Sequence, residues 1–264
     1  MTLKKYYYAA FIALFTATFL FTACSRNKMK PDLTVDERME QAIKLFIKKD
    51  YYNAKNQFRI ITLSYSGHKV ADRAQFYLAE CHYYEKEYIL AASEYERLIK
   101  VYPNSEYVDD AKYKLGVSYS KLAPKAALDQ EYTEKAIKEF KEFLEDYYYS
   151  PLVDKVEKAL QVAQNKLAKK KYEAATQYRK MGRLSAAIIY YTKVLESYYD
   201  SPYAPLAQYW LGECHRKLGE YAQAQEALNA FIEKYPTHEL IGKARDRLKD
   251  VNEQLAKVKL TNES

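Results

Sequence analysis

Residues 207–236, AQYWLGECHRKLGEYAQAQEALNAFIEKYP, repeat an earlier part of the chain, residues 74–103, AQFYLAECHYYEKEYILAASEYERLIKVYP. Twelve of the thirty aligned positions are identical at a constant offset of 133. The identities include Leu-x-Glu-Cys-His, Glu-Tyr and Tyr-Pro in the same order, which a shared helix-forming composition alone would not align. Self-similarity of this kind is typical of stacked supersecondary units, so the repeat is the basis of the fold prediction.

The second half of this unit occurs five times along the chain. The first position of each copy is tyrosine, leucine or threonine. Alanine, two large apolar residues and a tyrosine follow it at steps of three or four residues. These steps place all five positions on one face of a helix. The copies end at Tyr65, Tyr102, Tyr147, Tyr198 and Tyr235.

The first half of the unit places a small residue after leucine, as in Leu78-Ala79 and Leu211-Gly212, where a second helix can cross closely. The tetratricopeptide pattern consists of leucine and a small residue, followed at fixed spacing by alanine, an aromatic residue and proline. We therefore predict an all-α fold, a tetratricopeptide-type α-solenoid of five helix pairs over residues 34–258, with a C-terminal tail at 259–264.

The composition agrees with this fold. The chain has only 6 Gly and 7 Pro, too few for the frequent turns of a β-sandwich or barrel, while 48% apolar and 29% charged residues exclude disorder. The net charge of +7 is spread along the chain without blocks of like charge. The pattern indicates a solvated surface and no nucleic-acid partner.

The repeat intervals are 37, 45, 51 and 37 residues, and the two long ones have local causes. Residues 122–130, LAPKAALDQ, widen the loop inside the third unit. Residues 151–181 contain no helix breaker and predict one helix of about 45 Å. We expect this helix to extend beyond its partner and to project.

The N-terminus carries an export signal. Two lysines precede an uncharged stretch from Tyr6 to Ala23, and Cys24 follows the small residue. This resembles the bacterial lipobox, with Phe21 in place of the usual leucine. We predict a signal peptide at 1–23, lipidation of Cys24, and a tether over 24–33. The alternative is that the uncharged stretch spans the bilayer as a permanent anchor.

No catalytic motif and no metal-ligand motif is found in the sequence. Cys81 and Cys214 occupy the same slot in units two and five, too far apart for a disulfide, and we predict that both are small core residues. The adjacent histidines point about 100° away from them on a helix and cannot share a metal. We therefore expect a binding scaffold on a membrane, with no enzymatic activity, no metal and no cofactor apart from the lipid on Cys24.

Residues 167–218 carry the most specific resemblance to a known family, through Lys-Tyr-Glu, Tyr-Arg, Gly182 and the Ala-Ala-Ile run. Together with the lipobox, the tether and the five units, they resemble the outer-membrane β-barrel assembly lipoproteins of the BamD (ComL-like) family. The resemblance implies a lipid anchor on the periplasmic face of the outer membrane. It also implies docking onto the periplasmic domains of a β-barrel insertase, binding of unfolded outer-membrane protein precursors, and contact with other assembly lipoproteins. A periplasmic tetratricopeptide adaptor for Tol-Pal, peptidoglycan or secretion machinery is the alternative.

Two surfaces are candidates for these partners. For unfolded precursors, we predict a peptide groove on the first helices of units one to three, lined by Phe76, Glu80, Tyr83, Tyr84 and Tyr113. Packing between repeats is the competing explanation for these tyrosines.

For the insertase, we predict a basic and aromatic docking patch in units four and five. Its residues are Tyr172, Thr176, Arg179, Lys180, Arg183, Tyr209, Glu213 and Arg216. Arginine side chains suit a partner that offers carboxylates. The competing explanation is that these cations solvate a long helix and interact with its C-terminal dipole.

Overall fold

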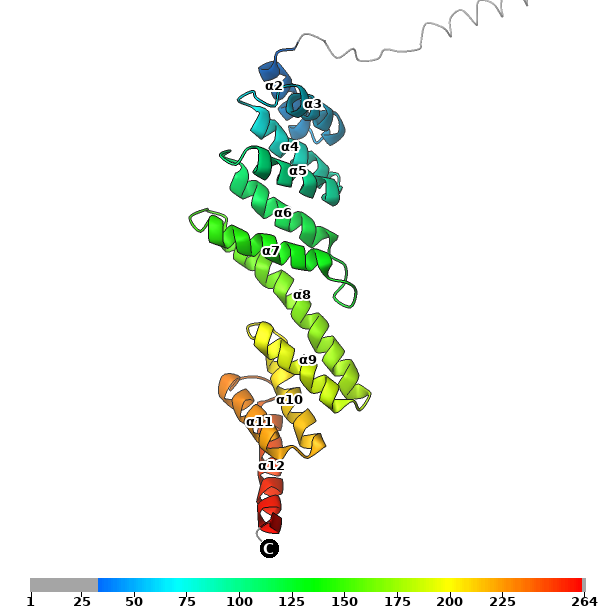
Figure 1. The fold of residues 1–264 in the computed structure, drawn as a ribbon, viewed down its shortest axis with the longest axis vertical. Helices are drawn as coiled ribbons and strands as arrows, with labels where there is room; N and C mark the ends of the chain where they lie inside the picture. The colour runs from blue at the N-terminus through cyan, green and yellow to red at the C-terminus, as the bar shows by residue number, and fades with distance from the viewer. Residues whose placement is uncertain (1–32, 263–264) are drawn as a thin grey trace, which may run out of the picture.

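A computed structural model describes residues 33–262 and, within them, eleven helices and no strand. The first ten form five antiparallel pairs (Figure 1). The pairs are α2 (Val35–Ile47) with α3 (Tyr51–Ser64), α4 (Ala71–Tyr84) with α5 (Tyr88–Val101), α6 (Val108–Leu122) with α7 (Glu131–Asp146), α8 (Val153–Lys180) with α9 (Leu184–Ser197), and α10 (Ala204–Leu218) with α11 (Tyr221–Lys234). The final helix is α12 (Ile241–Asn262). The prediction of an all-α solenoid of five helix pairs is confirmed.

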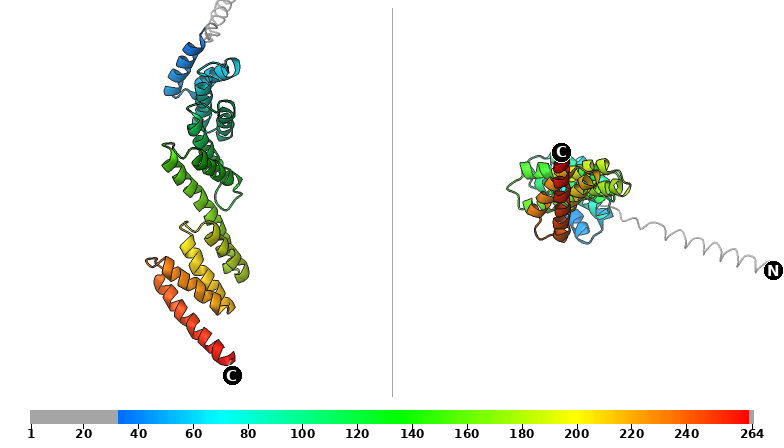
Figure 2. Two further views of the ribbon diagram at one scale, coloured as in Figure 1. Left: turned by 60° about the vertical axis from the view of Figure 1, so that its left-hand side comes forward. Right: turned by 90° about the horizontal axis from the view of Figure 1, so that it is seen from below.

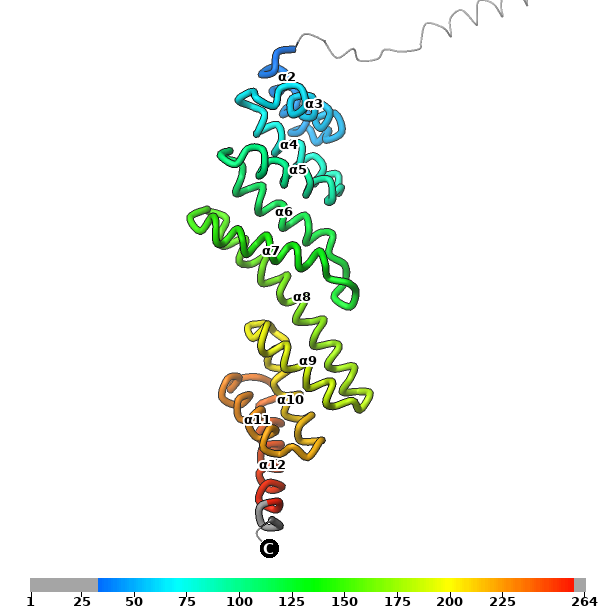
Figure 3. The backbone as a smooth tube through the Cα atoms, viewed as in Figure 1, coloured from blue at the N-terminus to red at the C-terminus, as the bar shows by residue number. Residues whose placement is uncertain are grey.

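Each helix packs against the next one in sequence, so the pairs follow one another along a single long axis (Figure 2). The backbone trace in Figure 3 shows that the turns within pairs lie along one edge and the connections between pairs along the other. The core consists of successive clusters, each shared by neighbouring helices. Fully buried aromatic rings such as those of Phe140 and Phe143 contribute about 1.5–3 kcal/mol each.

Small residues allow the two helices of a pair to cross closely, as the sequence predicts. A Cβ atom built on Gly116 would lie 2.5 Å from the Phe140 ring, and one on Gly212 would lie 2.8 Å from the Leu228 side chain. The alanine of the repeat pattern is fully buried at Ala91, Ala187 and Ala224. Cys81 and Cys214 are likewise buried, and both are free thiols.

The turn within a pair requires a left-handed residue after the first helix. Lys49, Lys86, Gly182 and Gly219 occupy this position in units one, two, four and five, with φ between 62° and 78°. Glycine adopts this conformation without strain, whereas lysine pays about 1–2 kcal/mol for it. Two of the four turns are therefore built with a residue that the backbone disfavours.

The long helix is present, but the prediction that it projects is wrong. α8 has 28 residues. Its first half packs against α7 through Val156 and Leu160, and its second half packs against α9 through Tyr172 and Ala175. The extra length therefore joins two halves of the solenoid, and both ends of the helix have a partner (Figures 1 and 2).

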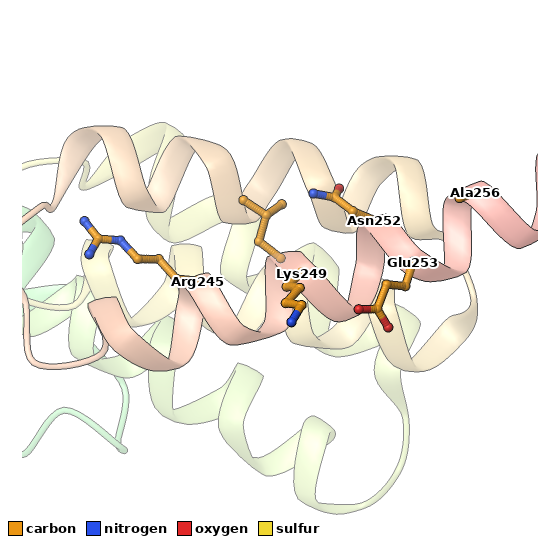
Figure 4. Close-up of a pocket in the computed structure, with 6 residues that line it drawn as sticks. Arg245, Lys249, Asn252, Glu253 and Ala256 are labelled. Atoms are coloured by element: carbon orange, nitrogen blue, oxygen red, sulfur yellow. The ribbon is translucent and has the colours of Figure 1, made fainter.

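α12 covers the last pair and was not singled out by the repeat pattern. It places Ala244 and Val251 in the same core cluster as Leu228 and Phe231. Lys249 lies at the position that glycine occupies in α6 and α10, 133 and 37 residues earlier. Its side chain points away from α11 on the outer face of α12, beside Arg245 and Glu253 (Figure 4). This polar face gives a further helix no close crossing point, as expected for a terminal capping element.

The predicted signal peptide (1–23), the lipidation site Cys24 and nearly all of the tether (24–33) lie outside the described residues. Within 33–262, no helix has both the length and the apolar character to cross a bilayer. At the other end, α12 continues to Asn262, so the boundary predicted after residue 258, between the solenoid and a tail at 259–264, falls within a helix.

Candidate protein-docking surfaces

Aromatic side chains from α2, α3 and α4 gather at the turn edge of units one and two. The rings of Tyr51 and Tyr84 are stacked with their centroids 5.1 Å apart, and Phe46 packs edge-on against Tyr84 at 5.8 Å and against Tyr77 at 5.0 Å. Tyr83 follows at 5.8 Å from Tyr84. Tyr84 remains 47% exposed. We call these five residues the N-terminal aromatic surface.

A buried ion pair supports this surface from below. Glu80 is 6% exposed, and its carboxylate accepts a hydrogen bond from the Tyr95 hydroxyl. The Nζ atom of Lys114 lies 2.9 Å and 3.1 Å from the two carboxylate oxygens of Glu80. The Lys114 ammonium lies 4.8 Å from the Tyr83 ring centroid and 5.8 Å from that of Tyr84. Burial disfavours the charged ammonium, yet the attraction of Glu80 outweighs it and raises the pKa of Lys114. Lys114 therefore stays charged beneath the two rings.

The structure brings together most, but not all, of the residues predicted for the peptide groove. Glu80, Tyr83 and Tyr84 surround Lys114. Burial is the main cause of the raised pKa of Tyr83, to which the neighbouring Tyr113 makes a small contribution. Phe76 lies two helical turns before Tyr84, where its ring stacks on Tyr107 at 5.1 Å. Tyr113 also packs against Phe140, with centroids 6.4 Å apart.

Three residues of the predicted docking patch fill the seam between α8, α9 and α10. The Arg179 guanidinium lies 3.7 Å from the Trp210 ring centroid, and its Nε donates to the Tyr191 hydroxyl at 3.2 Å. The Thr176 hydroxyl lies 3.3 Å from the same Tyr191 oxygen. The Tyr172 ring packs against Tyr191 at 5.8 Å. These contacts hold the second half of α8 onto its neighbours.

Three further residues of the patch lie on α10, facing α11 and α12. Tyr209 and Glu213 are 4% and 5% exposed. Glu213 accepts hydrogen bonds from Arg216 Nε at 3.0 Å and pairs with Arg247 Nε at 3.4 Å, and Arg216 extends to Asp250 at 3.2 Å. These charges are therefore satisfied within the protein.

Lys180 and Arg183 are the accessible cations of the patch. Both are exposed at the turn between α8 and α9, next to Met181, whose side chain is 56% exposed. Within residues 33–262, neither has an ion-pair partner. The part of the patch that can meet a partner is therefore this turn.

The ion pairs at Glu80 and Glu213 are copies of one contact, which the sequence analysis missed. The offset of 133 residues relates Glu80 to Glu213 and also relates Lys114 to Arg247. Gln75 and Gln208 follow the same rule, since each donates to a backbone carbonyl 19 residues later. Extending the alignment beyond Pro103 would have revealed the cationic partners.

The described residues hold no group of three or more histidine, cysteine or acidic side chains suited to a metal ion. His82 and His215 each contact the glutamate five residues later, with 2.6 Å between Nδ1 and Oε2. Burial raises the pKa of the Cys81 thiol to about 12 and that of Cys214 to about 11, so both are protonated at neutral pH.

Comparison with known proteins places this solenoid in a family. The family described as "Outer membrane lipoprotein" (YfiO) matches residues 31–229. The chain belongs to the YfiO family. The resemblance seen in the sequence is thereby confirmed.

Two curated relatives carry similar names. A protein of Aquifex aeolicus (strain VF5), named "Putative outer membrane protein assembly factor BamD", is 28% identical over 187 residues, which are 69% of this chain and 61% of the relative. "Outer membrane protein assembly factor BamD" of Caulobacter vibrioides is 21% identical over 207 residues, 76% of this chain and 68% of the relative. The YfiO-family chain thus spans about three fifths to two thirds of the length of these relatives.

Among solved structures, a TPR repeats protein from Bacteroides fragilis NCTC 9343 has a TM-score of 0.50 and 13% identity, with 83% of this chain and 99% of that chain covered. At this identity the similarity concerns the fold alone. It agrees with a tetratricopeptide solenoid.

Proposed function

We propose that this chain is a non-enzymatic outer-membrane lipoprotein of the β-barrel assembly machinery. In this role it docks on the periplasmic domains of the barrel insertase and binds unfolded outer-membrane protein precursors before insertion. The observation that carries the proposal is the YfiO-family match over residues 31–229, together with two relatives named as outer membrane protein assembly factors.

The N-terminal aromatic surface is suited to the precursors. Barrel precursors are chains with alternating aromatic and aliphatic residues, rich in aromatic girdles. The stacked rings of Tyr51 and Tyr84 offer flat contact area at small entropic cost. Lys114 lies beneath them with its charge balanced by Glu80, so it holds the rings of Tyr83 and Tyr84 in place through cation–π contacts. Exposed and firmly held aromatic rings thus coincide in units one and two.

The turn between α8 and α9 is suited to the insertase. Lys180 and Arg183 are exposed and project from a turn that Gly182 closes with a φ of 74°. Arg179 cannot leave its place on Trp210 without a loss of packing, and it therefore supports the turn from inside. Paired cations on a rigid turn fit a partner that presents carboxylates.

Lipidation of Cys24 would hold the solenoid at the periplasmic face of the outer membrane. A residue with two or more acyl chains anchors a protein stably, whereas one chain is marginal. The residues between Cys24 and α2 would give the solenoid some reach from the membrane surface. Contacts with accessory assembly lipoproteins are part of the same proposal.

Co-purification from native membranes tests the proposal. A tagged full-length chain is expressed in its own bacterium, solubilised in mild detergent, and its partners are identified by mass spectrometry. We expect the barrel insertase in amounts comparable to the bait. Recovery of a Tol-Pal or peptidoglycan factor in place of the insertase would contradict the proposal.

A matched pair of variants locates the docking surface in the same experiment. Lys180→Glu with Arg183→Glu should greatly reduce insertase recovery, with the melting temperature preserved, because both side chains are exposed and unpaired within the described residues. Lys141→Glu with Lys158→Glu makes the same change in charge at exposed positions of α7 and α8 and should leave recovery unchanged. Equal recovery with both pairs would remove the turn from the docking surface.

A further inference from the structure

The middle of α8 borders a cleft that neither candidate surface uses. The first half of α8 packs on α7 and the second half on α9, so the centre of the helix lies between the two halves of the solenoid (Figure 1). A cleft of about 590 Å³ is found there. Its lining includes Lys125, Val162, Lys166, Lys169, Glu173 and Tyr203. We call it the mid-helix cleft.

The widened loop of unit three forms one wall of this cleft and is firmly held. Gln130 is 3% exposed, and its amide donates to the carbonyl oxygen of Leu128 at 3.0 Å. From α8, Lys166 Nζ donates to the carbonyl of Ala123 at 3.0 Å and Lys170 Nζ to that of Leu128 at 2.8 Å. The insertion is therefore an ordered wall, and the turn between α9 and α10 contributes Pro202 and Tyr203 on the other side.

The charges in the cleft favour an anionic ligand. Three lysines line it, against one glutamate, Glu173, which pairs with Lys169 at 3.7 Å. Lys166 is partly buried, and its ammonium donates a hydrogen bond to the neutral carbonyl oxygen of Ala123. Burial lowers its pKa accordingly. A carboxylate brought into the cleft would give this ammonium the counter-charge that its own surroundings lack.

Apolar surface lies directly beside these charges. Val162 is 70% exposed on α8, although it lines the cleft, and Ala127 and Tyr203 are at least partly exposed. Such a mixture of methyl groups and ammonium groups suits a chain whose carboxylates alternate with small apolar side chains.

We propose that the mid-helix cleft binds an extended acidic segment of a partner protein, with Lys125, Lys166 and Lys169 pairing with its carboxylates. This is a third docking surface, independent of the precursor surface and of the turn between α8 and α9. It gives a role to two features that the repeat itself does not require, the insertion at 122–130 and the extra length of α8.

Binding of a defined peptide to the purified full-length protein tests this inference. The probe is a short fluorescein-labelled peptide in which glutamate alternates with alanine and valine, followed by fluorescence anisotropy. Lys125→Glu with Lys169→Glu should weaken binding by roughly tenfold or more, equivalent to about 1.4 kcal/mol. The control pair, Lys141→Glu with Lys158→Glu, carries the same change in charge outside the cleft and should change the affinity less than about twofold.

Two further measurements separate the cleft from general charge attraction. Carbodiimide coupling joins carboxylates to amines, and mass spectrometry should find the bound peptide on Lys125, Lys166 or Lys169 in preference to other lysines. The same peptide with glutamine in place of glutamate should not bind. Lys166→Gln keeps a donor for the Ala123 carbonyl while removing the charge, so it should weaken binding without lowering the melting temperature.

The inference is overturned if both charge-reversal pairs weaken peptide binding equally, or if the peptide is crosslinked evenly to lysines over the whole surface. It is also overturned if phosphatidylglycerol vesicles, and not the peptide, show the dependence on Lys125 and Lys169. None of these results depends on the insertase, so the inference can fail while the proposed function stands.

Discussion

Adding one methyl group at the helix crossing in unit three should destabilise the protein. A Cβ atom on Gly116 would lie 2.5, 2.8 and 3.0 Å from three carbon atoms of the Phe140 ring, against an ordinary contact distance of about 3.5–4.0 Å. Phe140 is fully buried, so its ring cannot turn aside into solvent. Overpacking of this kind costs about 1–3 kcal/mol. The better helix propensity of alanine offsets about 0.5–1 kcal/mol of it.

The net expectation for Gly116→Ala is a loss of up to about 2.5 kcal/mol, with a middle value of about 1 kcal/mol that lowers the melting temperature by about 2–4 °C. Gly242→Ala is the matched control, because it makes the same chemical change in a helix where a Cβ atom would meet nothing within 4 Å. This variant should melt no lower than the wild type. Circular dichroism on heating measures both. A Gly116→Ala protein that melts at or above the wild-type temperature would refute the packing described for α6 and α7.

Other predictions concern single turns and buried groups. Lys86→Gly should raise the melting temperature by up to about 6 °C, because relief of about 1–2 kcal/mol of strain at a φ of 64° exceeds the entropic cost of glycine, about 0.5–1 kcal/mol. Hydrogen bonds from His82, and to a smaller extent from Lys55, hold the pKa of the Glu87 carboxyl below its ordinary 4.5. These contacts therefore stabilise the folded protein above pH 4.5, and this stabilisation is lost as the pH falls through the lowered pKa. Thermal stability should therefore fall in acid, and less steeply in Glu87→Gln. In a Cys24→Ser protein, the thiols of Cys81 and Cys214 should resist thiol reagents at neutral pH until the chain unfolds, because both are buried. Rapid labelling of the native protein would contradict their burial.

Local periodicity made much of the fold predictable. The five copies of the repeat and the crossing glycines depend on contacts within a unit, where spacing along one helix determines what faces the core. Cys81 and Cys214 face core clusters that are shared with the preceding unit, and the repeat spacing was sufficient to predict their burial. α12 escaped notice because Lys249 replaces the small residue of the pattern, although Ala244 and Val251 carry the apolar face seven residues apart. The length of α8 could be predicted from the lack of breakers. Its packing on both α7 and α9 could not, since partners are set by the stacking of units.

The candidate sites were predicted less well, for a related reason. Glu80 and Glu213 were expected to face partners, yet each meets a cation 34 residues later, Glu80 with Lys114 in α6 and Glu213 with Arg247 in α12. Likewise Arg179 lies on Trp210, and Arg216 pairs with Glu213. Charge type is visible in the sequence, but whether a charge is satisfied depends on distances between units. Exposed residues such as Tyr84 and Arg183 remain available to partners.

If opposite halves of the solenoid serve different partners, two variants, one in each half, should lose different partners. Both variants are crosslinked in the native membranes, and insertase and precursor are quantified on the same purified sample. Tyr84→Ala should lose precursor and retain insertase, because Tyr84 is exposed in the N-terminal aromatic surface. Lys180→Glu with Arg183→Glu should lose insertase and retain precursor. Loss of both partners in each variant, or of neither, would contradict the assignment of separate roles to the two halves.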